Sequence, residues 1–227
     1  HRRHQSPSPQ KPTTRVGGSH RHCPAPPPQP PPLPQRQTHH SGQVGEAVRR
    51  SGLPRSDIFV VTKLAVSEHG RDRTRAALAA SLERLGLEYV DLYLIHTALG
   101  GQLLETWDTM LELRDAGKCR AVGVSNFGVP HLAGLAAAGR ELPDVNQVEL
   151  SCWLQQRPLA EFCASHGIRM MAYSPLAKTW RLEKTRVAQL AARAGCSEAQ
   201  LAIRWSLEQG FVTIPSTRGL AACRLSL

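Results

Sequence analysis

The stretch SLERLGLEYVDLYLIH, residues Ser81–His96, decides the expected fold, because it reads as the end of a helix, a turn and a strand. Three leucines spaced i, i+4 and i+7 give the helix one apolar face: Leu78, Leu82 and Leu85. Gly86 is suited to cap the helix, and Val90–Ile95 is almost wholly apolar, as expected of a strand buried on both faces of a parallel sheet. His96 ends that strand, where α/β proteins place their chemistry, although a histidine with a structural role fits this stretch equally well.

The same alternation of helix and strand continues on both sides of this stretch. The expected strands are Ile58–Thr62, Val90–Ile95, Ala121–Val124, Val145–Leu150, Arg169–Ser174 and Phe211–Ile214. The expected helices are an apolar stripe at 44–48, then Arg71–Leu85, Leu103–Ala116, Pro130–Ala138, Pro158–His166, Glu183–Ala194 and Ser197–Gln209. Such an alternation predicts a parallel sheet with right-handed crossovers, in an open doubly wound or a closed barrel form. No G-x-G-x-x-G motif follows a strand, which disfavours the doubly wound dinucleotide fold.

The charge of the chain does not indicate a nucleic-acid partner. The formal net charge is +10, but residues 1–43 contain no Asp or Glu and hold six basic residues: Arg2, Arg3, Lys11, Arg15, Arg21 and Arg36. The remaining residues are close to balanced, and they show no basic stripe interleaved with aromatics and no zinc-finger spacing. We therefore expect no nucleic-acid partner.

The cysteines and the hydropathy pattern point to the cytoplasm. The chain has six scattered cysteines without C-x-x-C or His-paired spacing, which predicts free thiols in a reducing compartment and no metal site. There is no run of about 18 apolar residues and no apolar signal-peptide region near the start, so we expect no membrane association.

Residues 1–43 are low in complexity and differ from the rest of the chain. Eleven prolines fall here, with no acidic or aromatic residue. Such a composition cannot bury enough apolar surface to fold, so we expect a disordered tail with polyproline II character at Pro24–Pro34. Three interpretations stay open. The segment is a proline-rich docking tail, an inert extension, or an artefact of a shifted reading frame or a faulty gene model.

Six blocks of residues 42–218 together resemble the aldo-keto reductase superfamily. The blocks are IFVVTKL, SLERLGLEYVDLYLIH, GKCRAVGVSNF, NQVELSCWLQ, GIRMMAYSPLA and LAIRWSLEQGFVTIPSTR. The IPSTR block is similar to that of 2,5-diketo-gluconate reductase-like members. The resemblance implies a (β/α)8 TIM barrel, with a nicotinamide cofactor across the carboxyl ends of the strands. It also implies that residues 44–227 form an incomplete barrel, which contains strands 3–8 of the family fold.

The resemblance further implies NADPH-dependent reduction of aldehydes or ketones to alcohols, by a monomer acting on small carbonyl substrates. Lys63 matches the family lysine that lowers the pKa of a catalytic tyrosine, and His96 matches the histidine that orients the carbonyl. The residues that match cofactor contacts are Ser125, Asn126 and Gln147 for the carboxamide, Tyr173 for ring stacking, Ser174 for the pyrophosphate, and Ser216, Thr217 and Arg218 for the 2′-phosphate. Many members have a lysine at the position of Ser216, so NADH is an alternative cofactor.

The sequence departs from the family at the catalytic acid. The family's Tyr and Asp lie before a V-G-x-A helix, which Val44–Ala47 matches, and Thr38 stands where the Tyr is expected. No Tyr precedes Tyr89 and no Asp precedes Asp57. We therefore expect impaired activity and exposed apolar edges on an incomplete barrel of low stability. The alternative is a non-catalytic NADPH-binding regulatory or scaffold subunit.

Overall fold

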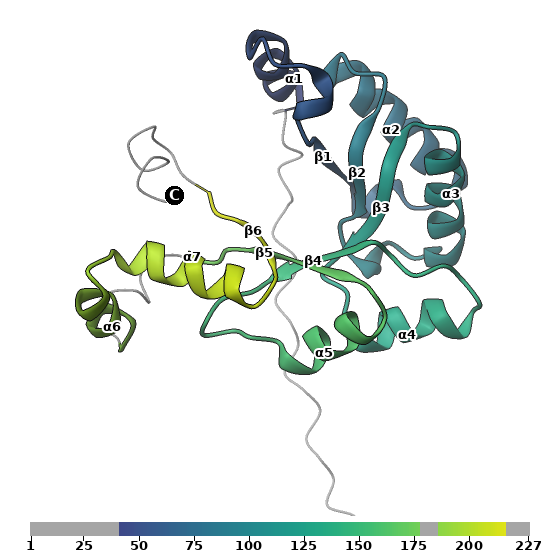
Figure 1. Cartoon of the computed structure of the whole chain (residues 1–227). Coiled ribbons are helices and arrows are strands. Elements are labelled where there is room, and N and C mark those ends of the chain that lie inside the picture. Colours follow the sequence, from purple (N-terminus) through teal and green to yellow (C-terminus); the bar gives the residue numbers. More distant parts are fainter. Residues whose placement is uncertain (1–40, 178–185, 217–227) are drawn as a thin grey trace, which may run out of the picture. The chain divides into compact units, whose positions relative to one another are not determined.

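Six parallel strands form a single sheet, in which each strand pairs with the next one along the chain (Figure 1). This arrangement is seen in a computed structural model that describes residues 41–177 and 186–216. The strands are β1 (Val61–Leu64), β2 (Val90–Ile95), β3 (Cys119–Ser125), β4 (Val145–Glu149), β5 (Arg169–Tyr173) and β6 (Val212–Ile214). The sheet order β1-β2-β3-β4-β5-β6 is that of a half-barrel, which confirms the expectation of an incomplete (β/α)8 barrel.

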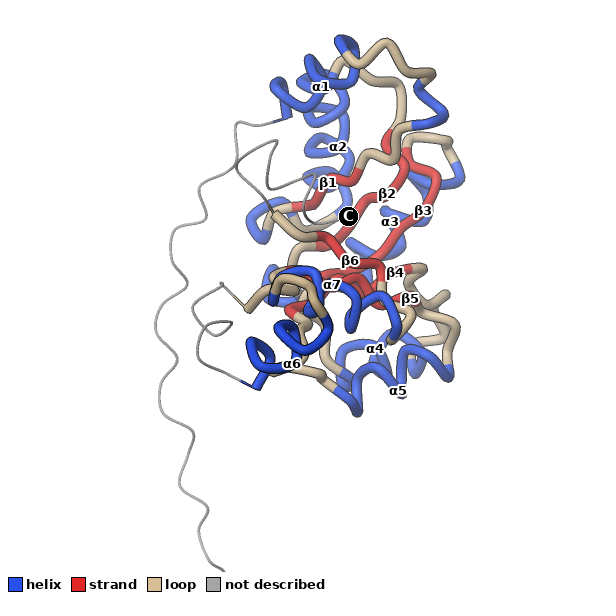
Figure 2. The backbone as a smooth tube through the Cα atoms, turned by 60° about the vertical axis from the view of Figure 1, so that its left-hand side comes forward, coloured by secondary structure: helices blue, strands red, loops and turns tan. Residues whose placement is uncertain are grey.

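Helices lie on the outer side of the sheet (Figure 2). They are α1 (Ser41–Arg50), α2 (Arg71–Leu85), α3 (Leu103–Asp115), α4 (Val129–Ala137), α5 (Arg157–Ser165), α6 (Arg186–Ala194) and α7 (Glu198–Glu208). Among them, α1 packs on α2 and α6 packs on α7. Three short 3-10 turns complete the fold: η1 (Arg55–Asp57), η2 (Val66–Glu68) and η3 (Ala98–Gly100). Parallel strands require crossover connections, because a tight hairpin can join only antiparallel strands.

The ends of two helices follow the capping signals in the sequence. Gly86 adopts φ 65°, in the left-handed region, and ends α2 as expected from its lack of a side chain. Before α7, the Ser197 hydroxyl accepts a bond from the Gln200 amide (3.2 Å), and the Gln200 side chain accepts one from the Ser197 amide (3.0 Å). This reciprocal pair is the capping box that the sequence predicted.

Most boundaries differ from the sequence expectation by one or two residues, and two larger differences concern the starts of β1 and α1. Strand β1 begins at Val61 rather than Ile58, because the Val60 amide donates to the Asp91 carboxylate (2.8 Å) instead of joining the strand ladder. Helix α1 begins at Ser41, so residues 41–43 are helical and do not belong to the low-complexity segment to which we assigned them. The rest of that segment, residues 1–40, lies outside the described residues.

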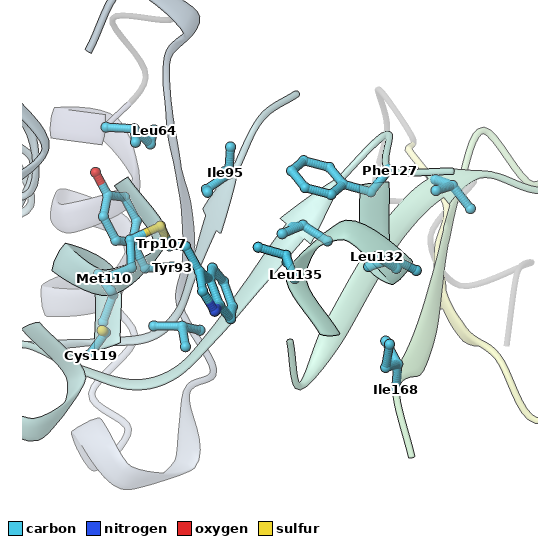
Figure 3. Packing of buried hydrophobic residues seen from close by; sticks show 14 of the residues in the cluster. Leu64, Tyr93, Ile95, Trp107, Met110, Cys119, Phe127, Leu132, Leu135 and Ile168 are labelled. Carbon is cyan, nitrogen blue, oxygen red and sulfur yellow. The ribbon is translucent and has the colours of Figure 1, made fainter. Parts of the chain in front are cut away.

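The main core lies between the outer face of the sheet and the helices (Figure 3). The three leucines expected on the apolar face of α2 are all buried there. Tyr93 and Ile95 of β2 pack into the same cluster as Trp107 and Met110 of α3. The Trp107 indole also donates to the Glu141 carbonyl (2.8 Å), so its one polar group is satisfied.

The inner face of the sheet carries a second, smaller apolar cluster. It consists of Leu92, Leu94 and Met171, with Ala121 and Val145 packed against them. Towards the two outermost strands this face is open among the described residues: Val61, Val212 and Ile214 are 37–38% exposed. The expectation of exposed apolar side chains at both ends of the sheet is therefore confirmed for these positions, whereas low stability stays a prediction.

Candidate active site

The predicted site residues lie towards the carboxyl end of the sheet. Because all six strands are parallel, residues that end different strands come to the same end. Those within the described residues are Lys63 in β1, His96 after β2, Ser125 and Asn126 at the end of β3, Gln147 in β4, Tyr173 and Ser174 at the end of β5, and Ser216 after β6. Thr217 and Arg218, expected at the 2′-phosphate, lie outside the described residues.

Lys63 and His96 lie on adjacent strands. The His96 amide donates to the Leu64 carbonyl (3.1 Å), which ties the end of β2 to the end of β1. Burial lowers the pKa of His96, and the positive charge of Lys63 lowers it further, so the imidazole is neutral at pH 7. Lys63 itself is on the outermost strand and exposed, yet the protein around its ammonium removes enough water to lower its pKa. In the described part of the chain, no carboxylate forms an ion pair with Lys63.

Asn126 connects three strand ends through its side chain. Its Nδ2 donates to the His96 carbonyl (3.0 Å) and lies 3.2 Å from the Ser125 hydroxyl. Its Oδ1 accepts a bond from the Tyr173 hydroxyl (2.9 Å). Asn126 adopts φ 60°, a left-handed conformation that asparagine tolerates better than most residues. The sequence identified each of these residues, but it gave no sign that Asn126 joins them.

The side-chain amide of Gln147 donates to a weak acceptor, a thioether sulfur. The side chain is 3% exposed, and its Nε2 lies 2.8 Å from the Met171 sulfur. A thioether accepts hydrogen bonds poorly, so a stronger acceptor such as a carboxamide oxygen would suit this donor better. The sequence analysis missed Met171, although alternation along β5 places it on the same face as Tyr173.

The Tyr173 hydroxyl stays protonated and donates a hydrogen bond within the site. Burial raises the pKa of Tyr173, and the nearby Glu149 carboxylate raises it further, so the hydroxyl remains a donor to Asn126 at neutral pH. Ser174, the next residue, adopts φ 51°. This left-handed turn ends the strand and directs the chain away from β5.

None of the three tyrosines of the chain has a hydroxyl bonded to Lys63. Tyr89 precedes β2 at the amino end of the sheet, with the Arg55 guanidinium 4.3 Å from its ring centre. Tyr93 is buried in the outer core, and within the described residues its hydroxyl has no hydrogen-bond partner. The Tyr173 hydroxyl is bonded to Asn126.

Three further observations concern only residues 41–177 and 186–216. The four cysteines in these ranges, Cys119, Cys152, Cys163 and Cys196, form no disulfide. No cluster of three or more His, Cys, Asp or Glu side chains there is placed to hold a metal ion. None of the helices there has the length and apolar character needed to cross a membrane.

Comparison with known proteins identifies the family. The model of the aldo/keto reductase family matches residues 38–224, which include every predicted site residue. The chain belongs to the aldo/keto reductase family. Among curated aldo/keto reductases, it is 42% identical over 177 residues to the 9,11-endoperoxide prostaglandin H2 reductase of Trypanosoma cruzi, covering 77% of this chain and 62% of that protein. It is 40% identical over 174 residues to the glyoxal reductase of Bacillus subtilis, covering 77% and 63%. The chain thus spans less than two thirds of the length of these relatives.

Solved structures of other aldo/keto reductases share the fold. An enzyme from a Medee basin deep-sea metagenome library superposes with a TM-score of 0.79 and 37% identity, covering 82% of this chain and 70% of that one. A Bombyx mori aldo-keto reductase in complex with NADP superposes with a TM-score of 0.73 and 32% identity, covering 82% and 68%. The six strands of this aldo/keto reductase therefore correspond to strands of a known barrel, and the resemblance read from the sequence motifs is confirmed.

Replacing Lys63 by Met is expected to raise the pKa of His96. The substitution removes the positive charge that opposes protonation of the imidazole, while the effect of burial remains. The pKa can be followed by NMR titration of the imidazole protons, with the His96 signal assigned by its loss in His96→Gln. Lys118→Met, just before β3 at the amino end of the sheet, is the control. An unchanged His96 titration in Lys63→Met would contradict the proximity of the two side chains.

Proposed function

We propose that this aldo/keto reductase binds NADPH at the carboxyl end of its sheet and that its reaction is the reduction of small aldehydes or ketones to alcohols. The observation that most directly supports this proposal is the hydrogen-bonded group of Ser125, Asn126, Gln147 and Tyr173. Its amide donors and its aromatic ring match the two recognisable parts of a nicotinamide, the carboxamide and the ring face. The NADP complex of the Bombyx mori relative and the name of the Bacillus subtilis glyoxal reductase support the same reading.

The residues of the site fit this cofactor. Ser125, Asn126 and Gln147 would hold the carboxamide, and Gln147 would exchange the weak sulfur acceptor for an oxygen. Tyr173 would lie against the nicotinamide ring, with Ser174 near the pyrophosphate. The 2′-phosphate would be bound by Ser216, Thr217 and Arg218, since an arginine guanidinium can donate two parallel hydrogen bonds to a phosphate. Since Ser216 carries no charge, NADH remains the alternative. When bound, the cofactor supplies a hydride.

Two side chains of the protein would act on the carbonyl. As a carbonyl is reduced, negative charge develops on its oxygen and needs hydrogen-bond donors or cations nearby. The neutral imidazole of His96 can donate an N–H to that oxygen, and the Lys63 ammonium adds positive charge on the adjacent strand. We propose that proton delivery is the impaired step, since neither a tyrosine hydroxyl nor a carboxylate is bonded to Lys63 among the described residues.

Calorimetric titration with NADPH tests the proposed function. We expect saturable binding to the wild-type chain, and about tenfold weaker binding to Tyr173→Ala, because aromatic stacking contributes roughly 0.5–1.5 kcal/mol. Tyr89→Ala is the matched control, since this tyrosine lies at the opposite end of the sheet. Absence of saturable binding to a folded wild-type chain would reject the proposal.

A non-catalytic NADPH-binding regulatory or scaffold subunit is the second candidate. It is favoured by the contrast between a well-connected carboxamide group and a Lys63 without a carboxylate partner in the described part of the chain. Binding of NADPH without detectable turnover of any aldehyde would favour this candidate over an enzyme.

We also propose that the chain works as a monomer in the cytoplasm. The thiols support a reducing compartment: Cys119 and Cys163 are buried and unpaired, and burial raises the pKa of Cys119 to about 11.

A further inference from the structure

His69 joins the segment that follows Lys63 to the segment that follows His96. It lies between η2 and α2, and its side chain is 0% exposed. Its Nδ1 is 3.0 Å from the carbonyl oxygen of Gly101, which follows η3. Because a carbonyl can only accept, Nδ1 must carry the proton and donate it to Gly101. The imidazole therefore bridges the loop after β1 and the loop after β2.

The His69 ring also fits against the main chain of Gly100. A Cβ atom at position 100 would overlap the ring atoms Cγ, Nδ1 and Cδ2 of His69. Only glycine leaves room for the ring to approach η3 so closely. His69 and Gly100 are therefore a matched pair, and a change at either one should separate the two loops.

Neighbouring hydrogen bonds hold the main chain of His69 and of the residue after it. Arg73 Nε donates to the His69 carbonyl (2.7 Å), and another nitrogen of the same guanidinium donates to the Gln102 side chain (2.8 Å). The Gly70 amide donates to the Thr106 hydroxyl at the start of α3 (2.9 Å). These bonds join the main chain around His69 to the starts of α2 and α3.

The loop that His69 contacts is partly packed against the core. The main chain of His96 is held by the Leu64 carbonyl and by Asn126; beyond it, Ala98 packs against the main core, whereas Leu99 is 79% exposed. Among the described residues, the bond from His69 is the one side-chain hydrogen bond to residues 97–101, and it adds to the packing of Ala98. The second ring nitrogen, Nε2, is buried and has no partner in the described part of the chain. An apolar side chain would avoid that unpaired nitrogen, which argues that the donor at Nδ1 is what the position requires.

We infer that His69 is a positioning residue that holds the loop after His96 onto the loop after Lys63, and so maintains the surroundings of the His96 imidazole. The inference rests on the proposed function only in treating His96 as the carbonyl-orienting residue. It assigns His69 no contact with substrate or cofactor.

NMR titration and limited proteolysis of His69 variants test this inference without cofactor. In His69→Leu, we expect cleavage within residues 97–101 to become about tenfold faster, as for loss of one buried hydrogen bond. We also expect the pKa of His96 to move back towards its ordinary value, because burial lowers it and release of the loop directly after His96 would admit more water. His69→Asn should preserve both properties, since its Nδ2 can donate to Gly101 in place of Nδ1. His166→Asn, an exposed histidine after α5, is the control.

Gly100→Ala provides a second test that leaves His69 in place. The added methyl group should displace the ring and reproduce the faster cleavage and the shifted His96 titration. If His69→Leu and Gly100→Ala lower stability while leaving both readouts unchanged, the role of His69 is structural only and the inference is overturned. Failure of NADPH binding would reject the proposed function but leave these readouts unaffected.

Discussion

This chain is expected to reduce glyoxal roughly 10²–10⁴-fold more slowly than the glyoxal reductase of Bacillus subtilis, as for an enzyme without its general acid. Reduction builds an alkoxide that must gain a proton as it forms. The Tyr173 hydroxyl is committed to Asn126, and the other two tyrosines lie at the amino end of the sheet and in the outer core. A proton from water would then replace a positioned donor, which accounts for the expected loss.

The rate can be followed as the loss of NADPH absorbance under identical conditions for both proteins. His96→Phe is the control that shows whether any slow turnover uses this site, because it removes the donor expected to contact the carbonyl oxygen. We expect it to lower the residual rate further. Turnover by the wild-type chain within tenfold of the relative would reject the proposal that proton delivery is impaired.

Replacement of Asp91 by Asn is expected to lower the free energy of unfolding by about 3 kcal/mol, the lower end of the range for breaking a buried ion pair. Asp91 is 1% exposed and accepts bonds from the Val60 amide (2.8 Å), Arg55 (2.7 Å) and Arg120 (3.3 Å). Asparagine leaves the Arg55 guanidinium without its countercharge. We take the lower end because the Arg55 side chain is 22% exposed and partly solvated.

The same substitution should remove a pH dependence. Burial alone would raise the pKa of Asp91, but the bonds from Val60 and Arg55 outweigh it and hold the pKa below its ordinary value. A carboxylate with a lowered folded-state pKa stabilises the fold above the unfolded pKa of about 3.9, and the effect is lost as the pH falls through the folded value. The difference in stability between wild type and Asp91→Asn should therefore be full at pH 7 and shrink on acidification.

Urea unfolding at several pH values measures both effects. Asp108→Asn is the control, because Asp108 pairs with Arg140 at the surface and its loss should leave the urea midpoint nearly unchanged. An Asp91→Asn variant as stable as wild type at pH 7 would show that this carboxylate does not hold the loop before β1 to the sheet.

The elements with strong local signals were predictable from the sequence. Helix α2 and strand β2 have the predicted bounds, Arg71–Leu85 and Val90–Ile95, because a leucine stripe, a capping glycine and an apolar run are all local. The start of β1 was not predictable, because the Val60 amide is bonded to a side chain 31 positions away. No local pattern reports such a long-range partner.

The candidate site likewise has one part that the sequence predicts and another part that it does not. The sequence by itself determined the parallel order of the strands and which side chains end them, because alternation and crossover rules bring those ends together. Only the tertiary structure decided that Asn126 bonds to both His96 and Tyr173, that Lys63 lowers the pKa of His96, and that His69 bridges two loops. These features depend on distances of a few ångströms between residues far apart in the chain, and such distances exist only once the sheet has formed.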